Sequence, residues 1–372
     1  MRSRRRALSR SADLRDVTDA EAPRLRPRPR EATSVRCRRD AMLASVARGR
    51  NGIVRGALVR RLSTASAPRT VVALGGNALV RPGEEGTPAQ QAARAREAAL
   101  HLAAFPRETQ LVVSHGNGPQ VGEILLRSDL TADKLPNIPI DLAVAATQGQ
   151  IGVMLQHALA DALSRPASTV CTTVVVSKDD PDFKNPTKYV GRFYDAEEAK
   201  VQTSALGWTM KEDPGRGWRR VVPSPKPTGI IEVESVRSLA SAGVVVVACG
   251  GGGVPAVQAG GSLTPVEAVV DKDLSSALLA RELGATRFII LTAVDEVMVD
   301  YAKPSERALR DVGVGELQKL AKEGQFPPGS MGPKIESVFA FLEGNPGSEV
   351  LITSPEALGD ALAGKRGTWI RS

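Results

Sequence analysis

The 372-residue sequence has few cysteines, few histidines and no long apolar run. No stretch reaches the roughly 18 uninterrupted apolar residues that suggest a membrane-spanning helix, so we expect no membrane span. The three cysteines, Cys37, Cys171 and Cys249, are odd in number and far apart. Their spacing suggests neither a disulfide framework nor a metal site, and it favours a reducing compartment. With only three histidines, histidine-based metal or triad catalysis has little to work with.

Common nucleotide-binding and metal signatures are also missing. No intact Gly-x-Gly-x-x-Gly opens the first strand–helix unit, which weakens a dinucleotide-binding or nicotinamide oxidoreductase interpretation. The run Gly359–Lys365 matches Gly-x-x-x-x-Gly-Lys, but Arg366 stands where a P-loop has Ser or Thr. It also lacks the strand–loop–helix context, so we interpret it as a coincidence. No His-Glu-x-x-His zinc motif occurs in the chain.

The formal net charge of +8 comes from one end of the chain. Residues 1–67 hold 18 arginines and six acidic residues, a net charge of +12. Residues 68–372 therefore carry 31 basic and 35 acidic side chains, a net charge of −4. Because nucleic-acid binding requires a basic folded surface, we expect no nucleic-acid partner for this part of the chain.

The basic N-terminal part divides into two compositions. Residues 1–40 are rich in Arg and Pro, which predicts a disordered extension. Residues 42–67 have no acids and mix Arg with Ser, Ala and Val, as an organelle transit peptide does. Met42 would then be the true start, and the protein would be mitochondrial or in a related organelle matrix. The alternative is a mis-assigned start and a cytoplasmic protein, and in both cases the folded domain is residues 68–372.

Short apolar runs alternate with helical patterns over the rest of the chain. Helices are predicted at Pro88–Phe105, Val121–Arg127 and Asp141–Leu163. The predicted strands are Thr70–Gly76, Gln110–Ser114, Ser168–Val176, Val244–Cys249, Arg287–Thr292 and Glu349–Thr353. This alternation predicts the α/β class, with a mostly parallel sheet covered by helices on both faces.

The stretch from 177 to 230 interrupts this rhythm. It is polar, rich in Pro and Gly, and contains Trp208 and Trp218. Structureless loops of this length are rare in compact domains. We therefore predict a small inserted subdomain or lid at about residues 177–230.

Glycine-rich loops follow several of the predicted strands. The loops are residues 75–78, 115–118, 250–253 and, less regularly, 292–295. Ligands of parallel sheets gather beyond the carboxyl ends of the strands, and glycine lets backbone N–H groups approach phosphate oxygens. One glycine pair would be explained by steric need alone. Three such loops in one chain favour a phosphate site.

Three lysines complete this pattern. Lys272, in Asp271-Lys-Asp273, and Lys334 stand at predicted helix starts, and Lys188 lies in the inserted segment. A lysine at a helix start opposes the helix dipole, so a phosphate partner explains it better than a solvated surface does. For each lysine alone, a solvated charge remains the alternative. Phosphoryl transfer needs mainly positioning and positive charge, which glycine loops, lysines and Mg²⁺ provide without a P-loop.

Seven segments, in one order and together spanning residues 70–372, resemble carbamate kinase of the amino-acid-kinase superfamily. They are VVALGGNAL (71–79), VVSHGNGPQVG (112–122), FKNPTKYVGRF (183–193), KEDPGRGWRRVVPSPKP (211–227), ACGGGGVP (248–255), VVDKDLSSALLA (269–280) and GSMGPKIES (329–337). The superfamily shares the first glycine loop and the Lys/Asp signals, whereas the third and fourth segments are features of carbamate kinase proper. Residues 1–67 are the one part that the resemblance does not explain.

The resemblance implies a three-layer α/β/α sandwich with a largely parallel eight-stranded sheet, a small protruding subdomain and a homodimer. It also assigns Lys188, Lys272 and Lys334 to the transferring phosphoryl group, with Asp273 holding the lysines. The implied phosphate and carbamate site comprises Gly75, Gly76, Asn77, Gly116, Asn117, Gly251 and Gly252. The implied nucleotide site comprises Thr292, Val294 and Asp295, with Lys272 and Lys334. Mg²⁺ would be held mainly by the nucleotide phosphates, with no protein side chain assigned as a ligand.

The resemblance implies reversible phosphoryl transfer between ATP and carbamate, giving ADP and carbamoyl phosphate. One site serves both directions, and we expect ATP synthesis in arginine and carbamoyl phosphate catabolism. Two alternatives stay open. The chain could be a related kinase that acts on an acyl carboxylate such as acetylglutamate, or on a nucleoside monophosphate. It could also be a nucleotide sensor without turnover, which the complete lysine set opposes.

Overall fold

The computed structural model describes residues 67–371 except 77, 78, 82 and 329. All elements below belong to one compact unit, Ala65–Ser372. The predictions for the basic extension and for Asn77 therefore lie outside the described residues, apart from Ala67. Within the described part of the chain, no helix is both long enough and apolar enough for a membrane span.

The centre of the unit is an eight-stranded sheet with strand order β15-β17-β16-β12-β1-β2-β9-β3. Its strands are β1 (Arg69–Leu74), β2 (Gln110–His115), β3 (Ala167–Thr169), β9 (Val245–Val247), β12 (Arg287–Leu291), β15 (Asp311–Gly313), β16 (Glu349–Thr353) and β17 (Thr368–Arg371). All neighbours are parallel except β16 and β17. The prediction of a largely parallel, eight-stranded sheet is confirmed. The short strands β15 and β17 were not predicted.

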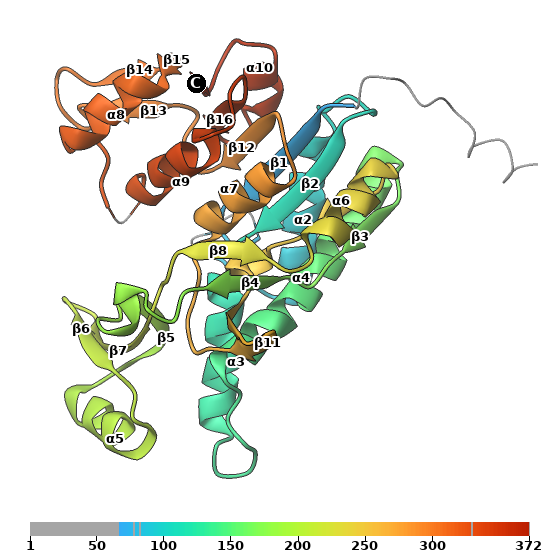
Figure 1. The fold of residues 1–372 in the computed structure, drawn as a ribbon. Helices are drawn as coiled ribbons and strands as arrows, with labels where there is room; N and C mark the ends of the chain where they lie inside the picture. The colour runs from blue at the N-terminus through green and yellow to red at the C-terminus, as the bar shows by residue number, and fades with distance from the viewer. Residues whose placement is uncertain (1–66, 77–78, 82, 329, 372) are drawn as a thin grey trace, which may run out of the picture. The chain divides into compact units, whose positions relative to one another are not determined.

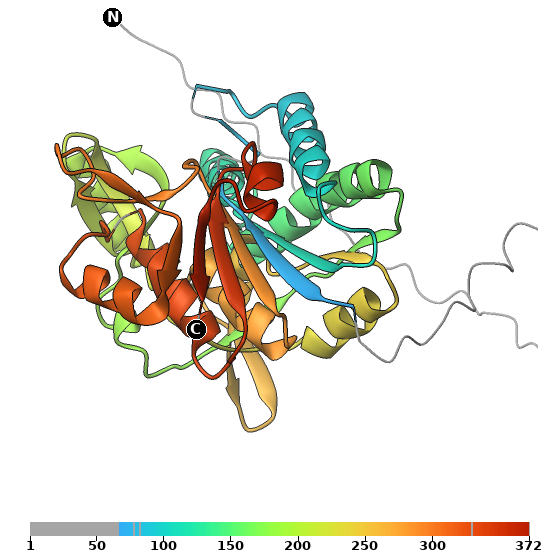
Figure 2. The ribbon, with the colours of Figure 1, turned by 90° about the horizontal axis from the view of Figure 1, so that it is seen from above.

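Helices cover both faces of this sheet, as Figure 2 shows. On β1, Val71 and Ala73 pack in one apolar cluster, whereas Val72 and Leu74 pack in another. The first cluster includes α6 (Val233–Ser241), α7 (Lys272–Glu282), α8 (Val314–Lys322) and α9 (Gly332–Leu342). The second includes α2 (Pro88–Leu102), α4 (Ile140–Leu163) and α10 (Leu358–Leu362). Because successive strand residues point to opposite faces, one apolar strand packs against the helices on both faces of the sheet. The three-layer prediction is confirmed.

One predicted strand, Ser168–Val176, is wrong because it forms two strands in different sheets. Only β3 joins the main sheet, and β4 (Thr173–Val176) belongs to a four-stranded sheet. Gln148 of α4 explains the break. Its side-chain amide donates to the carbonyl of Thr172 (3.1 Å), and its side-chain oxygen accepts from the N–H of Thr172 (2.9 Å). The Gln148 side chain thus replaces a backbone partner at the Thr172 N–H, while the Thr172 carbonyl also accepts from the N–H of Val254 (2.8 Å). The backbone can therefore leave the main sheet while its polar groups stay paired.

The second sheet has the order β11-β10-β4-β8. Its other strands are β8 (Pro227–Ile230), β10 (Val254–Ala259) and β11 (Ser262–Pro265). A separate hairpin is formed by β13 (Val297–Val299) and β14 (Arg307–Leu309). Helix α3 (Gly118–Leu130) is longer than its prediction, and α9 begins at Gly332 rather than at Ile335.

Between β4 and β8 the chain forms a small antiparallel sheet, β5-β7-β6, which stands apart from the main sheet in Figure 1. The insertion contains η2 (Pro181–Phe183), β5 (Lys188–Tyr194), α5 (Ala196–Leu206), β6 (Met210–Asp213) and β7 (Gly217–Val222). Its contact with α3 includes a hydrogen bond of 2.6 Å from the Tyr194 hydroxyl to the Asp129 carboxylate. Val190 and Val222 pack with Val121 of α3 in an apolar cluster. The insertion is therefore held at one edge, with its strand β5 near helix α3.

Candidate active site

Glycine loops from neighbouring strands meet at the carboxyl ends of β1, β2 and β9. A Cβ atom on Gly116 would lie 3.0 Å from the Cα of Gly76. A Cβ atom on Gly251 would lie 2.0 Å from the side-chain nitrogen of Asn117. The loops can approach this closely only because these positions lack side chains. The strand order places Gly75, Gly76, Gly116, Asn117, Gly251 and Gly252 together.

The loop after β9 is strongly curved. Its 3₁₀ turn η3 (Gly250–Gly252) has a φ of 65° at Gly251 and 93° at Gly252, in the left-handed region. The turn is linked to helix α7, because the Ser275 hydroxyl donates to the Gly252 carbonyl (2.8 Å). Asn117, which is buried, donates from its side-chain amide to the Thr147 hydroxyl (2.8 Å). The positions of both loops are therefore fixed by contacts to the surrounding helices.

Helix α7 begins at the lysine that the sequence singled out. Asp271 caps its first turn, accepting from the N–H of Asp273 at 2.9 Å. In the same turn, the Ser276 hydroxyl lies 2.6 Å from the hydroxyl of Ser114 on β2, and both are buried. These contacts fix the start of α7 against the end of β2. The sequence pattern carries no signal for this contact between Ser276 and the sheet.

Asp273 joins two lysines from different helices. Its carboxylate forms ion pairs with Lys272 beside it and with Lys334 of α9, whose Nζ is 3.0 Å away. The Asp273 side chain is only 5% exposed. Burial alone would raise the pKa of Asp273, but Lys272 and Lys334 outweigh it, and the pKa is lowered. The carboxylate is thus ionised and holds two ammonium groups close together, despite their mutual repulsion.

Lys188 of the insertion lies near the start of helix α7. Lys188, the first residue of β5, lies 3.5 Å from the carboxylate of Asp271. Its side chain is 43% exposed, so this ion pair is worth at most about 1 kcal/mol. The position matters more than the energy. Lys188 pairs with Asp271, two residues before the Asp273 that pairs with Lys272 and Lys334.

Two cavities adjoin this cluster. The first, about 490 Å³ and here called the polar cavity, is lined by Gly75 and Gly76 and by charged side chains such as Arg94 and Glu97. The second, about 440 Å³, is lined largely by apolar side chains. Thr292 and Lys334 line both cavities. A polar cavity thus meets an apolar one at the ends of β1 and β12.

The structure separates the predicted nucleotide-site residues. Thr292, Val294 and Lys334 line the apolar cavity, but Asp295 does not. The carboxylate of Asp295 accepts from the Ser354 hydroxyl and pairs with Arg366, both at 2.6 Å. The sequence reasoning missed the apolar residues of this cavity, Met298, Tyr301, Phe326 and Met331. Isolated aromatic residues between predicted elements could have pointed to Tyr301 and Phe326, but the sequence carries no such signal for Met298 and Met331.

His115, the last residue of β2, is buried. Its Nδ1 lies 3.0 Å from the Gly116 carbonyl, and its Nε2 has no partner among the described residues. Burial lowers the pKa of His115 from 6.5 to about 4. The imidazole is therefore neutral when folded and protonates in the unfolded chain.

This difference predicts acid sensitivity. The contribution of His115 to the free energy of unfolding should be fully present above about pH 6.5. It should fall by about 1.4 kcal/mol per pH unit as the pH drops from about 6.5 to 4. Urea unfolding of His115→Gln and of the wild type, across this range, measures the difference between their slopes. Carboxylates titrate in both proteins and cancel in that difference. Parallel stability curves would show that His115 does not cause the acid sensitivity.

Comparisons with known proteins show which family the chain belongs to. The model of the amino acid kinase family matches residues 68–354. Carbamate kinase of Thermococcus kodakarensis is 45% identical over 311 residues, covering 81% of this chain and 98% of the relative. Carbamate kinase 3 of Staphylococcus aureus is 43% identical, covering 82% and 99%. The structure of carbamate kinase from Giardia lamblia bound to AMP-PNP aligns with a TM-score of 0.78 and 38% identity, covering 82% and 99%.

The parallel sheet, the glycine loops and the family match define the class: this chain belongs to the amino acid kinase family. Within that family it groups with the carbamate kinases, and it has carbamate kinase function. It is an enzyme that transfers a phosphoryl group to a carboxyl-type acceptor. The alternatives left open by the sequence, a kinase for another acceptor and a sensor without turnover, are not favoured by these matches.

Proposed function

We propose that this site catalyses reversible, Mg²⁺-dependent phosphoryl transfer between ATP and carbamate, giving ADP and carbamoyl phosphate. The observation that carries the proposal is the buried Asp273, which holds Lys272 and Lys334 together beside the glycine loops. In the cell we expect the direction of ATP synthesis, in arginine and carbamoyl phosphate catabolism. We also propose a homodimer, on the family resemblance alone.

In this mechanism the glycine loops bind the small substrate and the transferring phosphate. Backbone N–H groups around Gly76, Gly116 and Gly251 can approach phosphate oxygens, since no side chains intervene. The predicted role of Asn77 belongs to the same loop. Carbamate and the γ-phosphoryl group meet in line between the loops that follow β1 and β2. The substrate is small enough to need no pocket for a side chain or a base.

The lysines supply the electrostatic part of catalysis. Lys272 and Lys334 neutralise charge on the transferring group and the leaving oxygen in a loose transition state. Asp273 positions both ammonium groups without itself touching substrate. Lys188 extends from the insertion toward the start of α7 and adds a third positive charge on the side of the site that faces the insertion. Supporting this assignment, the three lysines come from three separate elements and gather around two aspartates.

The nucleotide takes the apolar cavity for its base and the polar cavity for its phosphates. This proposal is supported by the cavity chemistry and by the relative from Giardia lamblia, whose structure holds AMP-PNP. The side chains at the transfer point suit a Mg²⁺ ion carried by nucleotide phosphates, because Asp273 already serves two lysines. The nucleotide phosphates would hold this ion, which would supply positive charge to the transferring group.

One assay tests the reaction. Purified full-length chain with ADP, carbamoyl phosphate and Mg²⁺ should produce ATP, measured by a coupled luciferase reaction. Acetylglutamyl phosphate as donor is the control and should give much less ATP. Turnover of acetylglutamyl phosphate in place of carbamoyl phosphate would contradict the proposal.

A further inference from the structure

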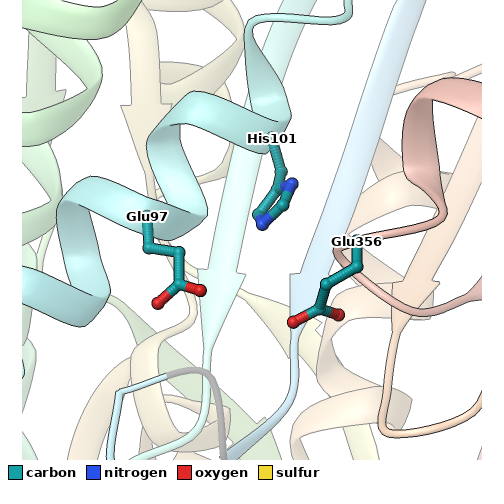
Figure 3. A group of neighbouring side chains, drawn as sticks. All are labelled: Glu97, His101 and Glu356. Atoms are coloured by element: carbon teal, nitrogen blue, oxygen red, sulfur yellow. The ribbon is translucent and has the colours of Figure 1, made fainter.

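Three side chains that the proposed reaction does not use converge on the wall of the polar cavity. Glu97 and His101 are four residues apart on α2, so they lie on one face of the helix. Glu356 comes from the segment between β16 and α10. Figure 3 shows the three side chains pointing toward a common point. One ligand atom from each, a ring nitrogen and two carboxylate oxygens, lies within 4.8 Å of the others.

This donor set selects a class of ion. One imidazole nitrogen with two carboxylate oxygens suits Zn²⁺ and related divalent transition ions, with a water in the remaining position. Mg²⁺ and Ca²⁺ prefer oxygen ligands alone, in larger numbers. Metal bonds of about 2.1 Å in tetrahedral geometry place ligand atoms about 3.4 Å apart. The side chains must therefore move inward by a small amount, which their partial exposure allows.

The surrounding charges favour ionised ligands but also provide a competitor. Glu97 pairs with Arg81 and with Arg94, each at 2.6 Å, and Arg81 lies 3.6 Å from Glu356. The hydrogen bond from Arg94 is the main cause that lowers the pKa of Glu97, and Arg81 adds to it. The His101 ring has no hydrogen-bond partner among the described residues, so it is free to ligate. A cation entering the cluster would displace Arg81 from the two carboxylates.

We propose that Glu97, His101 and Glu356 form a binding site for a divalent transition-metal ion, separate from the nucleotide-bound Mg²⁺. The site lies on the wall of the cavity that Gly76 and Lys334 also line. Arg81 occupies the carboxylates when the ion is absent and leaves them when it binds. The inference does not depend on the identity of the phosphoryl acceptor.

Titration with Co²⁺ tests the site on untagged, full-length chain without nucleotide or Mg²⁺. We expect visible d–d absorption from nitrogen and oxygen ligands, saturating at one ion per chain. His101→Gln should weaken binding by at least about tenfold, since even the loss of an outer-shell partner costs 10- to 100-fold. His157→Gln is the matched control, because that histidine is exposed on α4 and distant in sequence from the cluster. Equal Co²⁺ affinity in His101→Gln and wild type, or a thiolate charge-transfer band, would overturn the proposal.

Two further variants separate ligation from damage to the fold. Glu356→Gln changes a side chain that is 61% exposed, so the protein should fold normally and yet bind Co²⁺ at least about tenfold more weakly. Arg81→Ala removes the competitor and should bind Co²⁺ more tightly than the wild type. Unchanged affinity in Glu356→Gln, or weaker binding in a folded Arg81→Ala, would contradict the arrangement. Thermal melting without metal confirms that each variant is folded.

Discussion

Lys334→Ala is expected to lower kcat by roughly 10²- to 10³-fold while KM for carbamoyl phosphate changes little. Lys334 lines both cavities and comes from α9, whereas Lys272 comes from α7. The ammonium group of Lys334 therefore contributes positive charge at the point where the two substrates meet. Charge that develops mainly in the transition state is stabilised mainly there, so its loss lowers kcat rather than ground-state binding.

Steady-state kinetics in the direction of ATP synthesis measure this effect. Lys322→Ala is the control, because Lys322 is an exposed lysine in the last turn of α8 and should leave kcat unchanged. Asp273 keeps Lys272 as a partner in the Lys334 variant, so a large loss of stability is not expected. A folded Lys334→Ala enzyme with near-normal kcat would show that the assignment is wrong.

The sequence allowed the central part of the fold and site to be predicted because local patterns encoded it. The apolar runs at β1, β2, β12 and β16 are buried on both faces, so their composition alone marked them as strands. In an open parallel sheet, the loops after these strands must lie on one edge. The glycine loops could therefore be placed near one another before any contact was known, whereas Lys272 was assigned to the same site by the family resemblance.

Long-range side-chain contacts were beyond such patterns. Gln148 divides β3 from β4 through two hydrogen bonds across 24 residues, and nothing in the apolar run 168–176 marks that break. The carboxylate of Asp295 is held by Ser354 and Arg366, partners that are 59 and 71 residues away. The apolar cavity near β12 likewise gathers side chains from the β13 region and from the start of α9. Such sites depend on tertiary packing, which periodicity and spacing do not record.

Gly252→Ala is expected to destabilise the fold by more than about 3 kcal/mol. A Cβ atom at Gly252 would lie 2.2 Å from the Val270 carbonyl oxygen, and the φ of +93° is itself unfavourable for alanine. Since the obstacle is backbone, it cannot move aside as a flexible side chain could. The segment that contains Val270 leads directly into α7, so relieving the clash would shift Lys272.

Gly261→Ala is the matched control for this prediction. Gly261 has a similar φ of +83°, but a Cβ atom there would meet nothing within 4 Å. It should therefore show only the backbone cost, about 1–2 kcal/mol. Urea unfolding of both variants isolates the steric contribution at Gly252, and equal losses would contradict it. Any folded fraction of Gly252→Ala should also have a lowered kcat, because the Gly252 carbonyl accepts from Ser275 in the first turn of α7. A lowered kcat would then show that the geometry of the loop at Gly252 and the position of Lys272 depend on the same hydrogen bond, from Ser275 to the Gly252 carbonyl.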